Sequence, residues 1–240
     1  MGNHSVRSRE NVHPEIRLQV LNVYRVWRNK NYRDFGLERL IRLFLISIQF
    51  LFPGLYIRHL GGKTGGYLGR RLATETYILL KLLLPLSMLV FEFSPGPGLL
   101  FLVSYLMLET MLYLTSLIFL AFEFSPTVSY RRSLISIFIN FLEISISFGI
   151  LYKAGDELFP GFFSHPFDSG LHAVFFSFIT SATVGYGDIF PVHPLARVLV
   201  LAQVVFSFIF IGLIFNYFSS RAHEKGEYSQ LPLKGRNSRS

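Results

Sequence analysis

The sequence contains no cysteine, so it can form neither a disulfide framework nor a thiolate metal site. Charged residues are also scarce: they make up 16% of the 240 residues, against roughly 25% in ordinary soluble domains. The chain is instead 51% hydrophobic, contains 26 Phe, and has a mean hydropathy of +0.42. This composition predicts an integral membrane protein.

The few charged residues are unevenly distributed along the chain. The formal charge is +8, and 13 of the 23 Lys and Arg residues precede Glu75. Basic segments of this kind are typical of chains that face the anionic headgroups of a bilayer. Nucleic-acid binding is not expected, because the basic residues form no motif with a known docking geometry.

Side chains that could carry catalysis or hold a metal ion are thinly spread. His165, His172 and His193 are scattered, without the spacing that metal ligands need. No arrangement of nucleophile, base and acid accompanies them. We therefore expect neither an enzyme nor a resident cofactor.

Four apolar segments are each close to the roughly 20 residues that a helix needs to cross a bilayer. They cover about 74–93, broken by Pro85, then 98–122, 133–152 and 195–218. A stretch too long for a turn, 153–194, separates the third from the fourth. The prediction is an all-α integral membrane protein with four transmembrane helices, two of them peripheral within 74–130 and two in a unit covering 131–220.

Positive charge sets the expected orientation in the membrane. Basic residues flank the spans before the first, between the second and third, and after the fourth: Arg70, Arg71, Arg131, Arg132, Arg221 and Lys225. The opposite side is nearly free of them, since Lys153 is the one basic residue in 153–194. We expect a multi-pass protein of the cell membrane with cytoplasmic N- and C-termini. Its tail, 221–240, is expected to be too short for a ligand-binding domain.

Residues 1–73 are expected to form a cytoplasmic and membrane-interfacial region. Apolar residues at helical spacing between arginines predict a basic amphipathic helix over 14–30, lying either on the membrane surface or on the protein. The stretch 37–57 is apolar only at its centre, and a full span there would place the arginine-rich N-terminus outside. We therefore expect an interfacial or half-inserted helix. The glycines of 61–66 predict a flexible linker.

The most specific stretch is a six-residue loop between apolar segments, Thr183-Val184-Gly185-Tyr186-Gly187-Asp188. Gly185 and Gly187 reach positive φ at little steric cost, which lets successive carbonyls turn the same way. Four such loops around one axis would stack rings of carbonyl oxygens and of Thr183 hydroxyls. These rings would replace the water around a bare cation.

This loop resembles the selectivity filter of potassium channels. The resemblance runs position by position from 171 to 197, and more weakly over 133–218 for the outer and inner helices of a pore. Asp168 or Ser169 can cap a helix over 169–182, which the resemblance makes a re-entrant pore helix. It also implies a homotetramer that conducts potassium through a central pore. The ion-coordinating oxygens would come from the first four filter residues, with the last two at the filter mouth: Thr183, Val184, Gly185 and Tyr186, then Gly187 and Asp188.

Two positions that support the filter depart from the resemblance. Phe175 and Phe176 stand where many relatives carry Trp. A phenyl ring has no hydrogen-bond donor to offer Tyr186 or Asp188. We therefore expect the filter to be held by packing rather than by hydrogen bonds.

Three positions of the predicted inner helix are candidates for the cavity or the gate. Gln203 and Ser207 are four residues apart and share one face of the helix. They either line the cavity or hydrogen-bond to a neighbouring helix, and we favour the cavity. Gly212 is a candidate for a gating bend.

Three charged residues lie inside the spans: Lys81, Glu109 and Glu143. At 1.5 Å per residue, Glu109 lies about 16 Å from the outer end of its span, and Glu143 about 15 Å from the inner end of its span. Lys81 lies about 10 Å from the cytoplasmic side. Isolated charges at such depths are costly. We expect Lys81 to pair with one of the two carboxylates, either as glue between the peripheral helices and the pore or in a proton- or voltage-linked role.

The sequence does not identify the stimulus that opens the pore. No span has arginines at every third position, so a voltage sensor is not expected. Leak-like conduction, modulation by anionic lipid and control by an accessory subunit stay open. Two other functions compete with a channel: a non-conducting regulatory subunit, which the intact filter disfavours, and a potassium-uptake transporter subunit, which the single filter disfavours.

Overall fold

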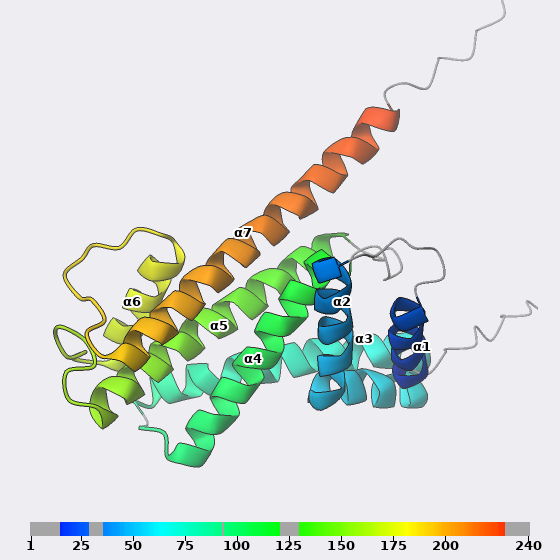
Figure 1. The fold of residues 1–240 in the computed structure, drawn as a ribbon. Helices are drawn as coiled ribbons and strands as arrows, with labels where there is room; N and C mark the ends of the chain where they lie inside the picture. The colour runs from blue at the N-terminus through cyan, green and yellow to red at the C-terminus, as the bar shows by residue number, and fades with distance from the viewer. Residues whose placement is uncertain (1–14, 29–35, 93, 121–129, 229–240) are drawn as a thin grey trace, which may run out of the picture.

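A computed structural model of the chain describes residues 15–28, 36–92, 94–120 and 130–228, and within these ranges the fold is all-helical. The helices are α1 (Glu15–Arg28), α2 (Gly36–Ile48), the short 3₁₀ helix η1 (Gln49–Leu51), α3 (Pro53–Val90), α4 (Pro97–Phe119), α5 (Tyr130–Leu158), α6 (Gly170–Ser181) and α7 (Pro194–Tyr228). Figure 1 shows α6 at one end of the molecule and α1 and α2 toward the other, with long helices between them.

Four of the described helices are long and apolar enough to cross a membrane: α3, α4, residues 134–158 of α5 and residues 194–215 of α7. The chain is therefore a multi-pass membrane protein, as its composition predicts. The start of α4 agrees with the predicted span 98–122 to within one residue, and α6 falls inside the predicted 169–182. Residues 121 and 122 of that span lie outside the described residues.

Two helices are longer than the predicted spans. α5 ends at Leu158 rather than at 152, and α7 ends at Tyr228 rather than at 218. The extra turns of α5 are polar and are stabilised by an ion pair one turn apart, with Lys153 Nζ 3.5 Å from Glu157 Oε1. Hydropathy marks where a helix leaves the bilayer, whereas the helix itself ends where its local interactions end.

The prediction that Pro85 breaks the first span is wrong. Pro85 is buried inside α3, and the backbone around it stays helical. The non-helical residues of α3 are instead Gly65 (φ −130°, ψ 16°) and Gly66 (φ 60°, ψ −140°). α3 therefore consists of two helical arms, 53–64 and 67–90, joined at a glycine turn.

The two arms of α3 lie against each other beside this turn. A Cβ atom added to Gly61 would lie 2.6 Å from the Cβ of Ala73 and 2.7 Å from the backbone oxygen of Gly69. Only glycine permits this approach, which is the usual role of small residues between membrane helices. The prediction of a flexible linker over 61–66 is wrong, and the domain boundary expected after residue 73 falls inside the second arm.

Residues 36–64 form two successive helices, α2 and the first arm of α3, which meet at η1; this segment is called the hairpin below, and its tip at η1 lies beside the middle of α4. Leu45 and Ile46 of α2 share a buried cluster with Leu120, which follows the last residue of α4. At the tip, the Tyr105 hydroxyl donates to the Leu51 carbonyl at 2.5 Å. If α4 spans the bilayer, the hairpin enters it to about half its depth. This placement agrees with the half-inserted alternative for 37–57.

α1 is the amphipathic helix predicted over 14–30. One side packs on the hairpin: Gln19 Nε2 donates to the Ile46 carbonyl and to Gln49 Oε1, both at 3.0 Å, and Val26 is buried. The other side exposes large apolar side chains, with Trp27 66% exposed. α1 therefore lies on the protein, and its other side exposes large apolar side chains.

The main core is built by α4, α5, α6 and α7 and is rich in aromatic side chains. α5 packs most extensively on α6. Two glycines of α5 make this possible: a Cβ on Gly149 would lie 2.6 Å from the Cα of Val174, and one on Gly155 would collide with the ring of Phe162. The short helix α6 is thus held tightly against a long membrane helix.

Candidate ion-conduction site

The short helix α6 has defined ends that deliver the chain into the filter loop. At its start, Ser169 Oγ accepts a hydrogen bond from the His172 amide at 3.2 Å, which confirms one of the two predicted N-caps. At its end, the Val184 amide donates to the Ile179 carbonyl at 2.9 Å and the Thr183 amide donates to the Thr180 carbonyl at 3.1 Å. These two bonds form a Schellman motif, and Thr183 occupies its left-handed position with φ 58°.

The left-handed position of such a motif is usually glycine, because a Cβ atom there costs roughly 1–2 kcal/mol. Thr183 accepts this strain in return for a hydroxyl group at the first position of the loop. Below it, the carbonyl end of α6 carries the partial negative charge of a helix C-terminus, which favours a nearby cation. The end of α6 and the start of the filter are thus one structural unit.

The filter backbone alternates in handedness. Positive φ occurs at Thr183 (58°), Gly185 (52°) and Gly187 (80°), and not at the two residues between them. Alternation between positive and negative φ can turn successive carbonyls toward one side of the strand. In an extended strand with negative φ throughout, successive carbonyls point to opposite sides. Residues 182–188 are all exposed in the single subunit. The backbone of the loop therefore lies at the surface of the single subunit.

Hydrogen bonds between two loops hold the chain that leaves the filter. The Ser164 amide donates to the Phe190 carbonyl at 2.9 Å, and the Phe190 amide donates to Ser164 Oγ at 3.1 Å. Phe163 and Pro191 form an isolated antiparallel bridge. The filter is therefore anchored at both ends, by α6 before it and by this pair of loops after it.

The two predicted aromatic supports have different positions. The Phe175 ring stacks on the Tyr186 ring, with centroids 6.2 Å apart and planes 16° apart. Phe176 is buried on the other side and packs edge-on against Tyr152 and Phe163. Of the two, Phe175 packs on the Tyr186 side chain of the filter, whereas Phe176 belongs to the core.

A polar network anchors α6 from behind. Gln203 of α7 is fully buried, and its Nε2 lies 2.8 Å from the Ser177 carbonyl, 2.7 Å from Ser177 Oγ and 2.7 Å from Ser181 Oγ. Its Oε1 accepts from the Tyr152 hydroxyl of α5, and Ser177 Oγ donates to the Ser145 carbonyl at 2.7 Å. One side chain therefore joins the inner helix to the last turn before the filter and to the outer helix.

The prediction that Gln203 and Ser207 line the cavity is wrong. Both side chains are buried inside the subunit, and Ser207 Oγ donates to the Gln203 carbonyl at 2.9 Å. The alternative, a hydrogen bond to a neighbouring helix, holds for Gln203, whereas Ser207 bonds within its own helix. Gly212 is exposed, and a Cβ added there would meet no atom within 4 Å.

Sequence reasoning missed Tyr152, Ser177 and Ser181, which complete the network. Ser177 and Ser181 are one turn apart in a mostly apolar helix, and Gln203 and Ser207 repeat this spacing on α7. Two matched polar stripes in membrane helices indicate that the helices face each other. That signal was visible in the sequence, although its pairing was not.

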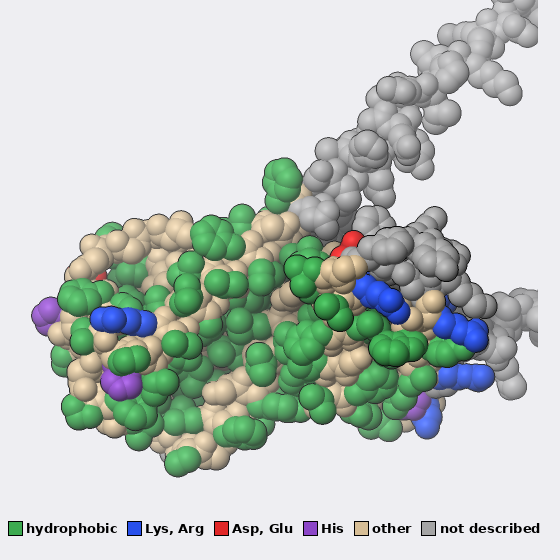
Figure 2. All heavy atoms as spheres, in the orientation of Figure 1, with side chains coloured by type: hydrophobic (Ala, Val, Ile, Leu, Met, Phe, Trp, Pro, Cys, Tyr) green, Lys and Arg blue, Asp and Glu red, His purple; other side chains and the backbone are tan. Residues whose placement is uncertain are grey.

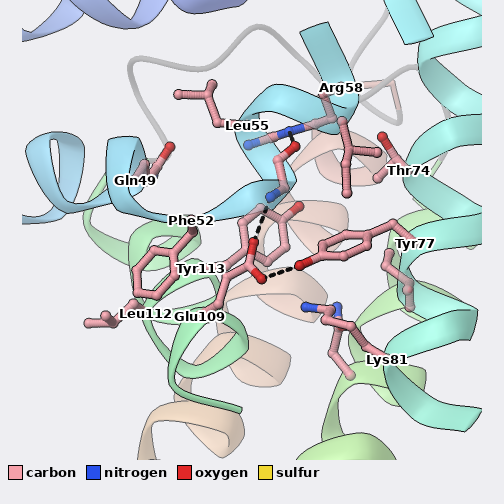
Figure 3. Close-up of a pocket in the computed structure, with 14 residues that line it drawn as sticks. Gln49, Phe52, Leu55, Arg58, Thr74, Tyr77, Lys81, Glu109, Leu112 and Tyr113 are labelled. Carbon is pink, nitrogen blue, oxygen red and sulfur yellow. Dashed lines mark hydrogen bonds between the residues drawn. The ribbon is translucent and has the colours of Figure 1, made fainter. Parts of the chain in front are cut away.

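The three charges inside the spans lie near one another, but not as predicted; Figure 3 shows two of them, Lys81 and Glu109. Among the described residues, Lys81 has no carboxylate within 4 Å, and its ammonium donates to Thr110 Oγ1 at 2.6 Å. Glu109 accepts from the Gly54 amide at 2.9 Å and from the Tyr77 hydroxyl. The predicted direct ion pair of Lys81 is therefore wrong. Glu143 is buried at 1% exposure, near enough to Lys81 to interact with its charge.

A short helix that ends in an exposed, glycine-containing loop between two long apolar helices defines a pore-loop membrane protein. Comparison with known families agrees: a family described as "Ion channel" matches residues 100–224, just over half of the chain. The chain belongs to this ion channel family and is not an enzyme.

Two curated relatives connect the chain distantly to potassium channels. Potassium channel K2 of Plasmodium falciparum is 39% identical over 54 residues, which is 22% of this chain and 4% of that protein. Two-pore potassium channel 5 of Arabidopsis thaliana is 28% identical over 88 residues, which is 37% of this chain and 20% of that protein. The chain thus aligns with at most a fifth of these relatives. No solved structure matches it.

Proposed function

We propose that the protein conducts potassium ions passively through a central pore formed by four copies of the chain. The observation that carries this proposal is the alternating backbone of residues 183–187, with positive φ at every second position. Carbonyl oxygens turned to one side, together with the Thr183 hydroxyl, supply the kind of oxygen ligands that replace water around potassium. Two relatives named as potassium channels support the choice of ion.

The need for several subunits follows from the single filter strand. One strand can offer only one wall of oxygens, and a closed ring requires symmetric copies around an axis. The exposed face of α7 supports this. Its large apolar side chains recur every three or four residues and are each more than half exposed: Val198, Leu201, Val205, Phe208, Ile211 and Phe215. This stripe is available to neighbouring subunits and lipid.

The proposed orientation places the filter mouth outside and both termini in the cytoplasm. In Figure 2, most Lys and Arg side chains gather at the end with α1 and α2, while the middle of that face is almost entirely apolar. Basic residues concentrate on the cytoplasmic side of membrane proteins. Gating by voltage is not part of the proposal, since no described span carries a ladder of arginines.

The test is a flux assay on full-length protein in liposomes loaded with potassium. We expect potassium efflux from wild-type liposomes and none above the empty-liposome level with Gly185→Val, because valine cannot hold φ near 52° without strain. Addition of a potassium ionophore checks that both vesicle preparations are intact. Equal efflux from the variant would contradict the filter, and an assembled but silent wild type would indicate a non-conducting subunit.

A further inference from the structure

A cavity of about 60 Å³ lies at the tip of the hairpin, among the first arm of α3, its second arm, α4 and α5, and a few charged side chains interrupt its apolar wall (Figure 3). A buried water needs roughly 10–15 Å³ of such volume, so the space suits a group of about four to six heavy atoms. The site is separate from the filter and plays no part in the proposed conduction pathway.

The cavity wall has more hydrogen-bond donors than acceptors. The Lys81 ammonium is 6% exposed and has three N–H groups, of which one is used on Thr110. Arg58 has five N–H groups, and among the described residues one of them, Nε, hydrogen-bonds, to the Gly54 carbonyl at 3.3 Å. The remaining contacts of both cations are with rings: Lys81 Nζ lies 5.0 Å from the Tyr77 centroid, and the Arg58 guanidinium lies 5.8 Å from that of Tyr113.

The acceptors around the cavity do not satisfy these donors. Both oxygens of Glu109 already bind the Gly54 amide and the Tyr77 hydroxyl. Asn140 lines the cavity at 1% exposure, and its Oδ1 has no partner among the described residues. Glu143 faces Lys81 from α5 but does not line the cavity, and its Oε2 is also without a partner there. Unpaired polar groups in a bilayer are costly.

The charges and the apolar wall together specify a guest. Two cations and one carboxylate line the cavity, with Glu143 behind Lys81, and the N–H groups that Lys81 and Arg58 do not use are open to an added acceptor. Most of the other lining side chains are apolar: Phe52, Leu55, Ile57, Ile78 and Leu112. We propose that this cavity binds the acidic head, a carboxylate or a phosphate, of an amphiphile dissolved in the membrane, with Lys81 and Arg58 as its ligands. The apolar wall then carries the adjoining carbon chain.

The test measures lipid binding to the full-length protein in phosphatidylcholine nanodiscs. The probes are spin-labelled stearic acid, spin-labelled phosphatidic acid and, as the neutral reference, spin-labelled phosphatidylcholine; the immobilised fraction of each is read by electron paramagnetic resonance. We expect at least one acidic probe to bind about tenfold more tightly than the neutral one, the difference that a charge-assisted hydrogen bond provides. The probe that shows the preference identifies the source of the head.

Three variants locate the binding. Lys81→Met and Arg58→Gln each remove one proposed ligand and are expected to lower the preference toward the neutral level, while Arg58→Lys restores part of it. Lys63→Met removes a charge from the exposed end of the same hairpin and should leave the preference unchanged. The proposal is overturned if wild type shows no preference for either acid, or if the preference survives both Lys81→Met and Arg58→Gln. Conduction plays no part in the readout, so failure here leaves the proposed function standing.

Discussion

The pore region (α5, α6 and α7) and the hairpin region (α2, α3 and the middle of α4) both bury polar groups, but they do so in different ways. Behind the filter the groups are neutral: the amide of Gln203 has hydrogen-bond partners for both its nitrogen and its oxygen. Around the hairpin tip the groups include the charges of Lys81 and Glu109, joined by the neutral Asn140 of α5, and Lys81 and Asn140 keep unused hydrogen-bonding capacity. A satisfied neutral network fixes one geometry, whereas a partly satisfied charged one favours an additional partner.

Packing follows the same division. In the pore region, Gly149 and Gly155 let α6 approach α5 closely, and the aromatic rings of the core fill the remaining space. In the hairpin region, Gly61 and Gly69 bring two arms of one chain together beside an open turn. The first arrangement immobilises a short helix, and the second holds the segment whose tip lies beside the middle of α4.

The largest effect is expected from a substitution that separates α5 from α6. Gly149→Val would place side-chain atoms within about 2.6 Å of the Val174 backbone, which cannot move aside. Overpacking against backbone should cost about 3 kcal/mol or more. We expect little assembled protein on size-exclusion chromatography. Gly98→Val is the matched control, because no atom lies near that glycine; equal loss in both variants would refute the packing role of Gly149.

Breaking the network behind the filter should have the next largest effect. Gln203→Leu leaves the Tyr152 and Ser181 hydroxyls buried without their partner, at about 1 kcal/mol or more each. We expect a lower unfolding temperature and a reversal potential shifted away from the potassium equilibrium value. The double variant Gln203→Leu with Tyr152→Phe should lose little more stability than Gln203→Leu alone, because both substitutions remove the same hydrogen bond between Tyr152 and Gln203. Full additivity would contradict a shared network.

A smaller effect is expected at the hairpin tip. Glu109→Gln keeps a side chain of the same shape but removes the negative charge at the start of α3, worth about 1 kcal/mol. Hydrogen exchange should become faster at Gly54 and its neighbours and stay unchanged in α6. Glu157→Gln, on the exposed end of α5, serves as the control. Unchanged exchange at Gly54 would show that Glu109 does not hold the hairpin.

The smallest effect is expected from Phe175→Trp. The ring already stacks on Tyr186, and the substitution adds an indole donor near the filter. One added hydrogen bond should stabilise the filter by about 0.5–1.5 kcal/mol. We expect slower loss of current during sustained recording, with selectivity unchanged. Phe176→Trp should instead destabilise the protein, because its ring is enclosed in the core.

Sequence patterns predicted the parts of the fold that depend on local chemistry. Hydropathy and length indicated the four membrane helices, and Ser169 marked the start of α6. They failed where distant segments decide the outcome. The glycines of 61–66 looked like a linker because their packing partners belong to the other arm of α3. Gln203 was assigned to the cavity because its partners lie 22, 26 and 51 residues away. Lys81 was predicted to pair with a carboxylate because its actual partner, Thr110, is neutral and gives no charge signal in the sequence.

The most direct test of potassium conduction is the reversal potential of the wild-type protein in a planar bilayer, with potassium on one side and sodium on the other. We expect a reversal close to the potassium equilibrium potential, and block of the current by barium. A reversal near zero, with both ions carried equally, would mean that the filter of residues 183–188 does not select potassium.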